Sequence, residues 1–398
     1  MPPIGFPLAP CADQTLTQLA TATGSAALAN LDGATLLCER AMLGGMTIPG
    51  RTSAGGGCRL FDAVGDTIAL NLARATDREL LPALFETDDL DTDSLAAIAA
   101  RIAKSDAAEL VSRGRSMGLA IAAEHEAVVS PAGVCVELVS GFPPVGSAVA
   151  ASAPRHAPRV VDLSALWAGP LAAHLLWLAG ADVVKVESRT RPDAMREGNN
   201  TFYALLNQGK ASVVLDFTDT NDRQALLSLI GAADVVIEAA RPRALAQLGI
   251  DAAQIVRTTP GLVWVTITGH GAVGEAANWV GFGDDCSVSG GLSAALRETT
   301  GRTGFVGDAI ADPLTGMAAA LVAWEAWMSR RGGRFGLAMS HVVAQCLAMA
   351  REQDPAALHS TLMAWSAAAG QPFPTVGRRP IGAVPAFGEN THSYTWRG

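Results

Sequence analysis

The stretch Gly304-Phe-Val-Gly-Asp-Ala-Ile-Ala-Asp-Pro-Leu-Thr-Gly-Met317, with the Ala-rich run that continues to Met328, organises the chain. Apolar residues in its second half recur at three- and four-residue steps, which predicts one apolar helical face. Asp312 is expected to cap this helix, with Pro313 at the first helical position, where a missing N–H has no cost. The positive end of the helix dipole would then hold the Asp312 carboxylate ionised.

Asp312 has two interpretations at this point. An ionised carboxylate in a fixed position is what a covalent catalyst that attacks an acyl group needs. An Asp-Pro pair at a helix start is also typical of a simple cap, and the local pattern alone favours the cap.

The composition indicates a folded chain of 398 residues, which suggests two or three domains of roughly 150 residues each. Hydrophobic residues make up 49% and charged residues 17%, so disorder is excluded. No apolar run reaches the roughly 18 residues of a membrane span, and the N-terminus lacks the basic start and apolar core of a signal peptide. We therefore expect a cytoplasmic protein that does not enter a membrane.

The net charge and the cysteine pattern limit which partners and cofactors the chain is expected to bind. The net charge is −9 and the basic residues form no long patch, so nucleic acid is not expected as a partner. A few local Arg or Lys side chains could still hold an anionic cofactor. The six cysteines contain no Cys-x-x-Cys pair, which favours reduced thiols over a disulfide or zinc framework, and no metal site is expected.

The pattern of predicted strands and helices divides the chain into domains. Residues 1–150 are predicted to form a small α+β domain. Residues 151–159, rich in Pro and small residues, are predicted to be a linker. Residues 160–345 repeat strand and helix with short Val/Ile-rich strands, which predicts an α/β, Rossmann-like domain with a parallel sheet. Residues 346–398 are expected to form a C-terminal helix and tail that pack on the large domain or on a partner.

The first turn of the large domain is a candidate dinucleotide site. The order strand, turn, helix and strand ending at Glu187 is that of a Rossmann unit. The turn Ser164-Ala-Leu-Trp-Ala-Gly-Pro170, however, has one glycine where Gly-x-Gly-x-x-Gly needs three. Pro170 also removes an N–H that would bind a pyrophosphate. NAD and FAD are therefore disfavoured.

Several local motifs between residues 160 and 340 occur in the order in which one protein family carries them. They are Val161-Asp-Leu-Ser, Ala168-Gly-Pro170, Leu178-Ala-Gly-Ala-Asp-Val-Val-Lys-Val-Glu187, Asn207-Gln-Gly-Lys210, Ala233-Asp-Val-Val-Ile-Glu238, Ile267-Thr-Gly-His-Gly271 and Ala311-Asp-Pro-Leu-Thr-Gly316. In this order they resemble the family III CoA-transferases, which include formyl-CoA transferase, carnitine CoA-transferases and α-methylacyl-CoA racemase.

The resemblance implies a catalytic role for Asp312, which falls on the position of the family's nucleophilic aspartate. Asp308 does not, and is expected to support the site or to belong to a turn. Asp312 would attack an acyl-CoA thioester, giving an anhydride and then an enzyme–CoA thioester from which an acceptor carboxylic acid takes CoA. Backbone N–H groups of Gly290-Gly291 or Gly55–Gly57 would stabilise the oxyanion. Coenzyme A is then a substrate, and no permanently bound cofactor is expected.

The resemblance also implies contacts to coenzyme A at the ends of the first strands. The expected residues are Trp167, Ala168, Leu215, Asp216, Ala240, Arg241, Gly281 and Phe282. Two basic positions of the formyl-CoA branch carry Ser188 and Gln247 here, so a nearby arginine would have to bind the phosphates.

Two departures leave alternatives open. In the family the small domain normally follows the large one, but here it precedes it, so this chain resembles a permuted family member. The family forms interlocked homodimers, and a homodimer is expected here as well. Whether a permuted chain still interlocks is open. The racemase branch carries a Gly-His-Asp motif that is absent here, which disfavours a racemase or isomerase. His270, Asp284 and Asp285 are candidates for a second base, and structural roles are favoured for all three. A non-catalytic CoA-binding homologue is the remaining alternative.

Overall fold

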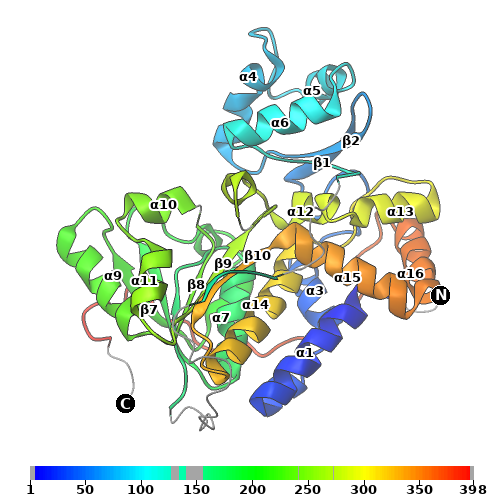
Figure 1. The fold of residues 1–398 in the computed structure, drawn as a ribbon. Helices are drawn as coiled ribbons and strands as arrows, with labels where there is room; N and C mark the ends of the chain where they lie inside the picture. Colours follow the sequence, from blue (N-terminus) through cyan, green and yellow to red (C-terminus); the bar gives the residue numbers. More distant parts are fainter. Residues whose placement is uncertain (1–4, 127–133, 140–155, 241, 272, 395–398) are drawn as a thin grey trace.

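The computed structural model describes residues 5–394 except 127–133, 140–155, 241 and 272. It contains a large α/β body and a small domain that sits on one edge of that body (Figure 1). The class predicted from the sequence, a Rossmann-like parallel sheet with a smaller α+β domain, is confirmed.

The large body is built on a seven-stranded sheet in the order β4-β10-β9-β8-β5-β6-β7. Six strands are parallel, and β4 pairs antiparallel with β10 at one edge. The strand order reverses between β5 and β8, as in doubly wound folds, whose ligands bind at the carboxyl ends of the strands beside that point. The strands are β4 (Val134–Val139), β5 (Arg159–Asp162), β6 (Asp182–Ser188), β7 (Ala211–Leu215), β8 (Val235–Glu238), β9 (Val263–Thr268) and β10 (Gly333–Ala338).

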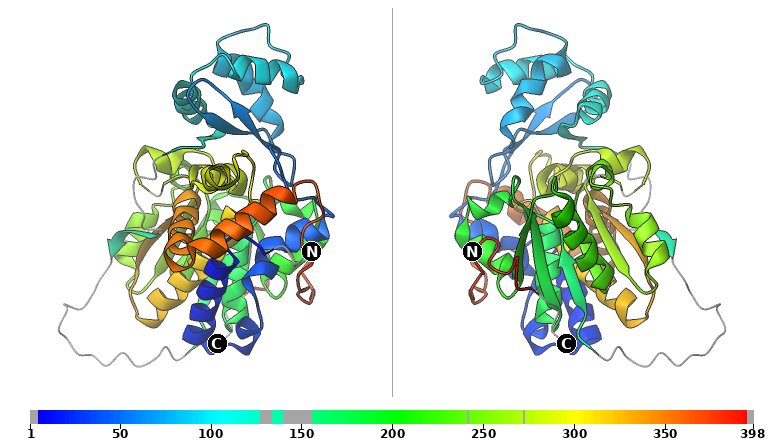
Figure 2. Two further views of the ribbon diagram at one scale, coloured as in Figure 1. Left: turned by 90° about the vertical axis from the view of Figure 1, so that its right-hand side faces the viewer. Right: turned by 90° about the vertical axis from the view of Figure 1, so that its left-hand side faces the viewer.

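Helices cover both faces of this sheet (Figure 2). Alternate residues of each strand enter different cores, because side chains of a strand point to opposite faces. In β5, Val160 packs in the core that contains α7 (Ala168–Leu178) and α14 (Ala311–Met328), whereas Val161 packs in the core of α9 (Thr220–Ala232) and α11 (Ala252–Thr258).

Residues 9–43 belong to the large body, which corrects the expected domain boundary. The helices α1 (Ala9–Thr23), α2 (Ala26–Ala29) and α3 (Gly33–Leu43) contribute to the same core as α14. Their apolar pattern predicts helices, but a local pattern does not tell which core an apolar face joins. In Figure 1 the dark blue α1 lies beside α14, far from the small domain.

A disulfide joins α1 to the C-terminal part of the chain. Cys11 of α1 pairs with Cys346 of α15 (Met339–Gln353), which corrects the expectation of reduced thiols. Their separation of 335 residues gave no local signal of pairing. Because α15 also runs through position 346 without a break, the boundary expected there is wrong as well.

The small domain is a three-stranded antiparallel sheet covered by helices. Its strands are β1 (Cys58–Asp62), β2 (Thr67–Asn71) and β3 (Ala120–Ala123). Its helices are η1 (Ala75–Leu80), α4 (Leu81–Phe85), α5 (Leu95–Ile102) and α6 (Ala107–Met117). A separate core of Ile68, Leu84, Ile98 and their neighbours holds these elements together.

The remaining helices connect the strands of the large sheet or follow its last strand. They are η2 (Ala194–Arg196), α8 (Asn200–Asn207), α10 (Pro242–Gln247), η3 (Glu275–Asn278), α12 (Gly283–Ser289), α13 (Leu292–Thr300) and α16 (Pro355–Ala367). The tail then returns to the edge strand β7, where Asn390 exchanges hydrogen bonds with Ser212. Within the described ranges, no helix combines the length and the apolar character needed to cross a membrane.

Candidate active site

Asp312 lies in the first turn of α14 and is not its cap. The helix begins at Ala311, and Ile310 at the N-cap position already has helical backbone angles. The carboxyl therefore turns away from the N–H groups of its own helix, and the backbone N–H of Ala168 hydrogen bonds to it instead. The expected N-cap is wrong by two residues, because Ile310 holds that position, and the Asp312 carboxyl lines a cavity instead.

The pKa of Asp312 is raised to about 7, mainly by burial and also by the carboxylates of Asp284 and Asp308. The guanidinium of Arg40 and the N–H of Ala168 act in the opposite direction. The expectation that the helix dipole holds this carboxylate ionised is thus corrected: desolvation outweighs the dipole, and the group titrates near neutral pH.

Arg40 places a positive charge beside the carboxyl groups of Asp284, Asp308 and Asp312. It reaches the site from α3, and its Nε lies 2.8 Å from Oδ2 of the fully buried Asp308, with Nη2 on the other carboxylate oxygen. Its guanidinium also stacks over the Trp167 ring, 5.0 Å from the centroid. Asp308 therefore supports the site by holding Arg40, in line with the role expected for it.

Asp284 is the third acidic group. Its Oδ1 accepts a hydrogen bond of 3.0 Å from the backbone N–H of Ala309. Its pKa is raised to about 6, mainly by burial and also by the charge of Asp308, while Arg40 acts in the opposite direction. Asp284 thus contacts the backbone just before Asp312, and it is not among the described residues that line the cavity.

The cavity that Asp312 faces has a volume of about 260 Å³ and lies at the reversal of strand order. Ala165 and Leu166 follow β5, and Ala239 and Ala240 follow β8. The charged side chains among the described residues that line it are Asp312 and Arg74. The site therefore has the position at which doubly wound folds bind ligands.

Four of the residues expected to contact coenzyme A line this cavity together with Asp312. They are Ala168, Ala240, Gly281 and Phe282. Trp167 is buried beside it under Arg40. Leu215 ends β7 and Asp216 follows it, two strands from the reversal point, and neither residue lines the cavity. Arg241 lies outside the described residues.

Gly283 explains how the Asp312 carboxyl fits. A Cβ added to Gly283 would lie 2.2 Å from Oδ2 of Asp312 and 2.3 Å from the carbonyl oxygen of Ala309. No other residue fits there without displacing the carboxyl. Neither Gly290 nor Gly55, weighed for the oxyanion, is among the described residues of the cavity wall.

His270 and Asp285 form a buried network outside the cavity lining. Nε2 of His270 lies 3.2 Å from Oδ2 of Asp285, and Nδ1 lies 3.1 Å from Oγ of Ser289. Cys286 completes a group of three possible metal ligands. Burial raises the pKa of the Cys286 thiol well above its usual value, so it stays protonated, whereas metals bind the thiolate.

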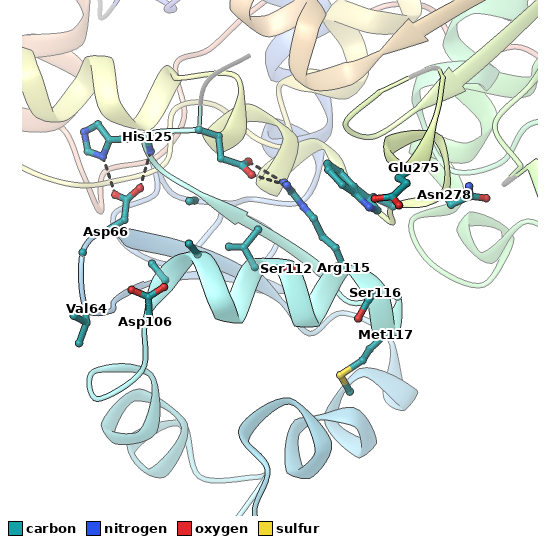
Figure 3. A pocket seen from close by; sticks show the side chains of 18 of the residues that line it. Val64, Asp66, Asp106, Ser112, Arg115, Ser116, Met117, His125, Glu275 and Asn278 are labelled. Atoms are coloured by element: carbon teal, nitrogen blue, oxygen red, sulfur yellow. Dashed lines mark hydrogen bonds and ion pairs between the residues drawn. The ribbon is translucent and has the colours of Figure 1, made fainter. Parts of the chain in front are cut away.

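A larger cavity of about 1240 Å³ adjoins the first, and Trp279 lines both. It lies between α6 of the small domain and the segment around η3 (Figure 3). The Asp66–His125 pair stands at one end of it, and Glu275 and Asn278 stand at the other.

The motifs and the position of the site agree with a known family. The profile of CoA-transferase family III matches residues 157–386, more than half of the chain. The protein belongs to this family.

Curated relatives match the chain in part. The succinate–glutarate CoA-transferase of Agrobacterium fabrum is 32% identical over 172 residues, 40% of this chain and 43% of that protein. The succinyl-CoA–D-citramalate CoA-transferase of Chloroflexus aurantiacus is 30% identical over 180 residues, 44% of this chain and 45% of that protein. The chain thus spans about half the length of the curated relatives it matches.

Among solved structures, a hypothetical protein from Mycobacterium tuberculosis aligns with a TM-score of 0.45 at 27% identity. The alignment covers 51% of this chain and 61% of that one.

Proposed function

We propose that this protein moves coenzyme A from an acyl-CoA to an acceptor carboxylic acid, with Asp312 as the nucleophile. The observation that carries the proposal is a carboxyl with a pKa of about 7 that faces a cavity at the carboxyl ends of β5 and β8. The names of the matched relatives, which describe CoA transfer between carboxylic acids, support the same reaction.

In the first half of the reaction, an oxygen of ionised Asp312 attacks the thioester carbonyl carbon. The C–S bond breaks, coenzyme A leaves as its thiolate, and a mixed anhydride joins the acyl group to Asp312. The thiolate then attacks the aspartyl carbonyl carbon. The anhydride C–O bond breaks, the donor acid leaves as a carboxylate, and Asp312 carries coenzyme A as a thioester.

The second half reverses these steps with the acceptor acid. Its carboxylate attacks the aspartyl thioester and forms a new anhydride, and the released thiolate then attacks the acceptor's carbonyl carbon. The new acyl-CoA leaves and the Asp312 carboxylate is restored. No proton is gained or lost by Asp312, so the enzyme needs this carboxyl ionised at the start of each cycle.

The two adjoining cavities provide room for the substrate. The smaller cavity suits the acyl group and the thioester, since Asp312 lines it. The larger cavity, which shares Trp279 with it, offers the volume that the rest of a CoA molecule requires. Ala168, Ala240 and Gly281 line the smaller cavity with small side chains, which leave room for the acyl group and the thioester beside the backbone.

Racemisation receives less support. Two-base proton exchange needs a second base opposite Asp312. Arg74 is the other charged side chain in the described wall of the smaller cavity, and a guanidinium does not act as a base near neutral pH.

The homodimer and the cytoplasmic location remain predictions. Size-exclusion chromatography with light scattering would measure the first. The Cys11–Cys346 pairing does not favour a reducing compartment, where protein disulfides are rare.

The Asp312→Ala variant tests the proposal. We expect CoA transfer between a thioester and a free acid to fall by at least about a thousandfold, because the covalent step is lost. Glu325→Gln, on an exposed position of the same helix, is the matched control and should keep wild-type activity. Near-normal turnover in Asp312→Ala would rule out the assigned nucleophile.

A further inference from the structure

The cavity of Asp312 contains one fixed positive charge. Of the described residues in its wall, Arg74 alone carries a cationic side chain, and the other residues apart from Asp312 are apolar, small or uncharged. A guanidinium facing a small, mostly apolar space is well suited to bind a carboxylate there.

Arg74 is held rigidly by the small domain. Its Nε donates to Oδ1 of Asp77 at 2.8 Å, and its own backbone N–H donates to Oδ2 at 2.9 Å. Nη2 donates to the carbonyl oxygen of Gly118 at 2.7 Å. Asp77 is fully buried, whereas about a third of the Arg74 side chain remains exposed. The anchoring therefore fixes one edge of the guanidinium and leaves part of it accessible.

Consecutive residues connect this cation to the nucleophile. The Arg74 guanidinium lies over the Phe282 ring, 5.9 Å from the centroid. The next residue, Gly283, contacts the Asp312 carboxyl. Arg74 and Asp312 thus lie against neighbouring residues of the α12 start, on the wall of one cavity.

The cavity volume limits what can lie between them. About 260 Å³ corresponds to the space of about nine water molecules. A short acyl chain with a second carboxylate fills such a space. A pantetheine arm with its phosphates is far larger, so the phosphates of coenzyme A would lie elsewhere while the thioester is at Asp312.

We propose that Arg74 binds the free carboxylate at the far end of the acyl group, so that the substrates are short dicarboxylic acids carried as CoA monothioesters. The proposal rests on the proposed function, since it needs the thioester carbon at Asp312. Arg74 is then the specificity residue for the acid, contributed by the small domain, while the large body contributes the nucleophile.

The test compares succinyl-CoA with butyryl-CoA, which have similar length but differ in the terminal charge. Hydroxylamine traps the acyl group, so CoA release can be followed without an acceptor acid. In wild type we expect kcat/KM for succinyl-CoA to exceed that for butyryl-CoA by about tenfold to a hundredfold, as for a charged hydrogen bond.

The Arg74→Gln variant should lose this preference through the succinyl-CoA value alone and leave butyryl-CoA unchanged. Arg74→Lys, which keeps the charge, should retain part of the preference and reports on the site if the Gln variant folds poorly. Arg78→Gln is the control. Arg78 lies on η1, the helix that Arg74 precedes as N-cap; its side chain donates to the Thr92 carbonyl oxygen, and it does not line the cavity. It should behave as wild type.

Either of two results would overturn the proposal. Equal losses for both thioesters in Arg74→Gln would place Arg74 on the coenzyme or in the fold. A wild type without preference for succinyl-CoA would remove the anionic subsite. Failure of the proposed function looks different, because wild type would then release CoA no faster than Asp312→Ala from either thioester.

Discussion

At the scale of single residues, the site depends on one arginine among three carboxylates. Asp284, Asp308 and Asp312 lie around Arg40, which bonds to Asp308 directly and acts on the other two by charge. This arrangement keeps Asp312 close to its titration point at neutral pH. A carboxylate with a raised pKa is also a stronger nucleophile once ionised, as Brønsted behaviour requires.

The pH dependence of transfer follows from this pKa. Because the nucleophile is the ionised form and the pKa of Asp312 is about 7, we expect the rate to rise with pH through about 7 and then to level off. Arg40 lowers that pKa, so Arg40→Leu should move the rise to higher pH by about one unit or more. Arg40→Lys, which keeps a positive charge, should move it less. A pH–rate profile unchanged in Arg40→Leu would contradict this assignment.

The sequence predicts Asp312 as the nucleophile because its motif is local, whereas no local pattern points to Arg40 or Arg74. Arg40 is 268 residues from Asp308 in the chain. Arg74 follows a predicted strand in a domain whose docking onto the large body could not be inferred. Leu215 and Asp216 were expected at the site by resemblance, yet β7 lies at the edge of the sheet.

At the scale of elements, the close packing of α7 against α14 positions the nucleophile. A Cβ added to Gly316 of α14 would lie 2.7 Å from the carbonyl oxygen of Ala168 and 3.0 Å from a methyl group of Leu171. The same Ala168 presents its N–H to Asp312. The helix contact and the hydrogen bond to the carboxyl therefore depend on each other.

Gly316→Ala should therefore push the two helices apart. We expect the free energy of unfolding to fall by about 1–3 kcal/mol, as in other overpacked cores, and transfer activity to fall with it. Gly231→Ala is the control, because a Cβ there on α9 meets nothing within 4 Å. It should leave the stability unchanged or raise it by about 0.5–1 kcal/mol. Urea unfolding of both variants measures the difference, and equal stabilities would refute the packing argument.

The strands of the large body were predictable, since short Val/Ile-rich runs between helical segments indicate a covered parallel sheet. The start of α14 lies two residues before the predicted one, because Ile310 adopts helical angles that the Asp-Pro signal does not reveal.

At the scale of the whole molecule, helix α3 of the N-terminal part contacts the C-terminal tail. Glu39, next to Arg40 on α3, bonds Arg379 of the C-terminal tail, with Nε to Oε2 at 2.7 Å and Nη2 to Oε1 at 2.5 Å. Both side chains are buried, with 2% and 4% exposed. The tail thereby holds the helix that carries Arg40, which the expected domains of residues 1–150 and 346–398 did not anticipate.

Replacing one member of this buried pair should lower the free energy of unfolding more than replacing both. Arg379→Met leaves the Glu39 carboxylate buried without its partner, and we expect a loss of about 3–5 kcal/mol in the free energy of unfolding. The double variant Glu39→Met/Arg379→Met should recover most of this loss. Arg351→Met, which breaks the exposed Arg351–Glu298 pair, should cost less than about 1 kcal/mol. A double variant as unstable as Arg379→Met would argue against the buried pair.

The central claim is that Asp312 carries the acyl group and then coenzyme A. Intact-protein mass spectrometry after incubation with a panel of acyl-CoA thioesters, with and without hydroxylamine, tests it directly. We predict a hydroxylamine-sensitive mass increase that maps to the peptide containing Asp312 and is absent from Asp312→Ala. The same adduct in Asp312→Ala, or no adduct with any thioester despite measurable CoA binding, would contradict the claim.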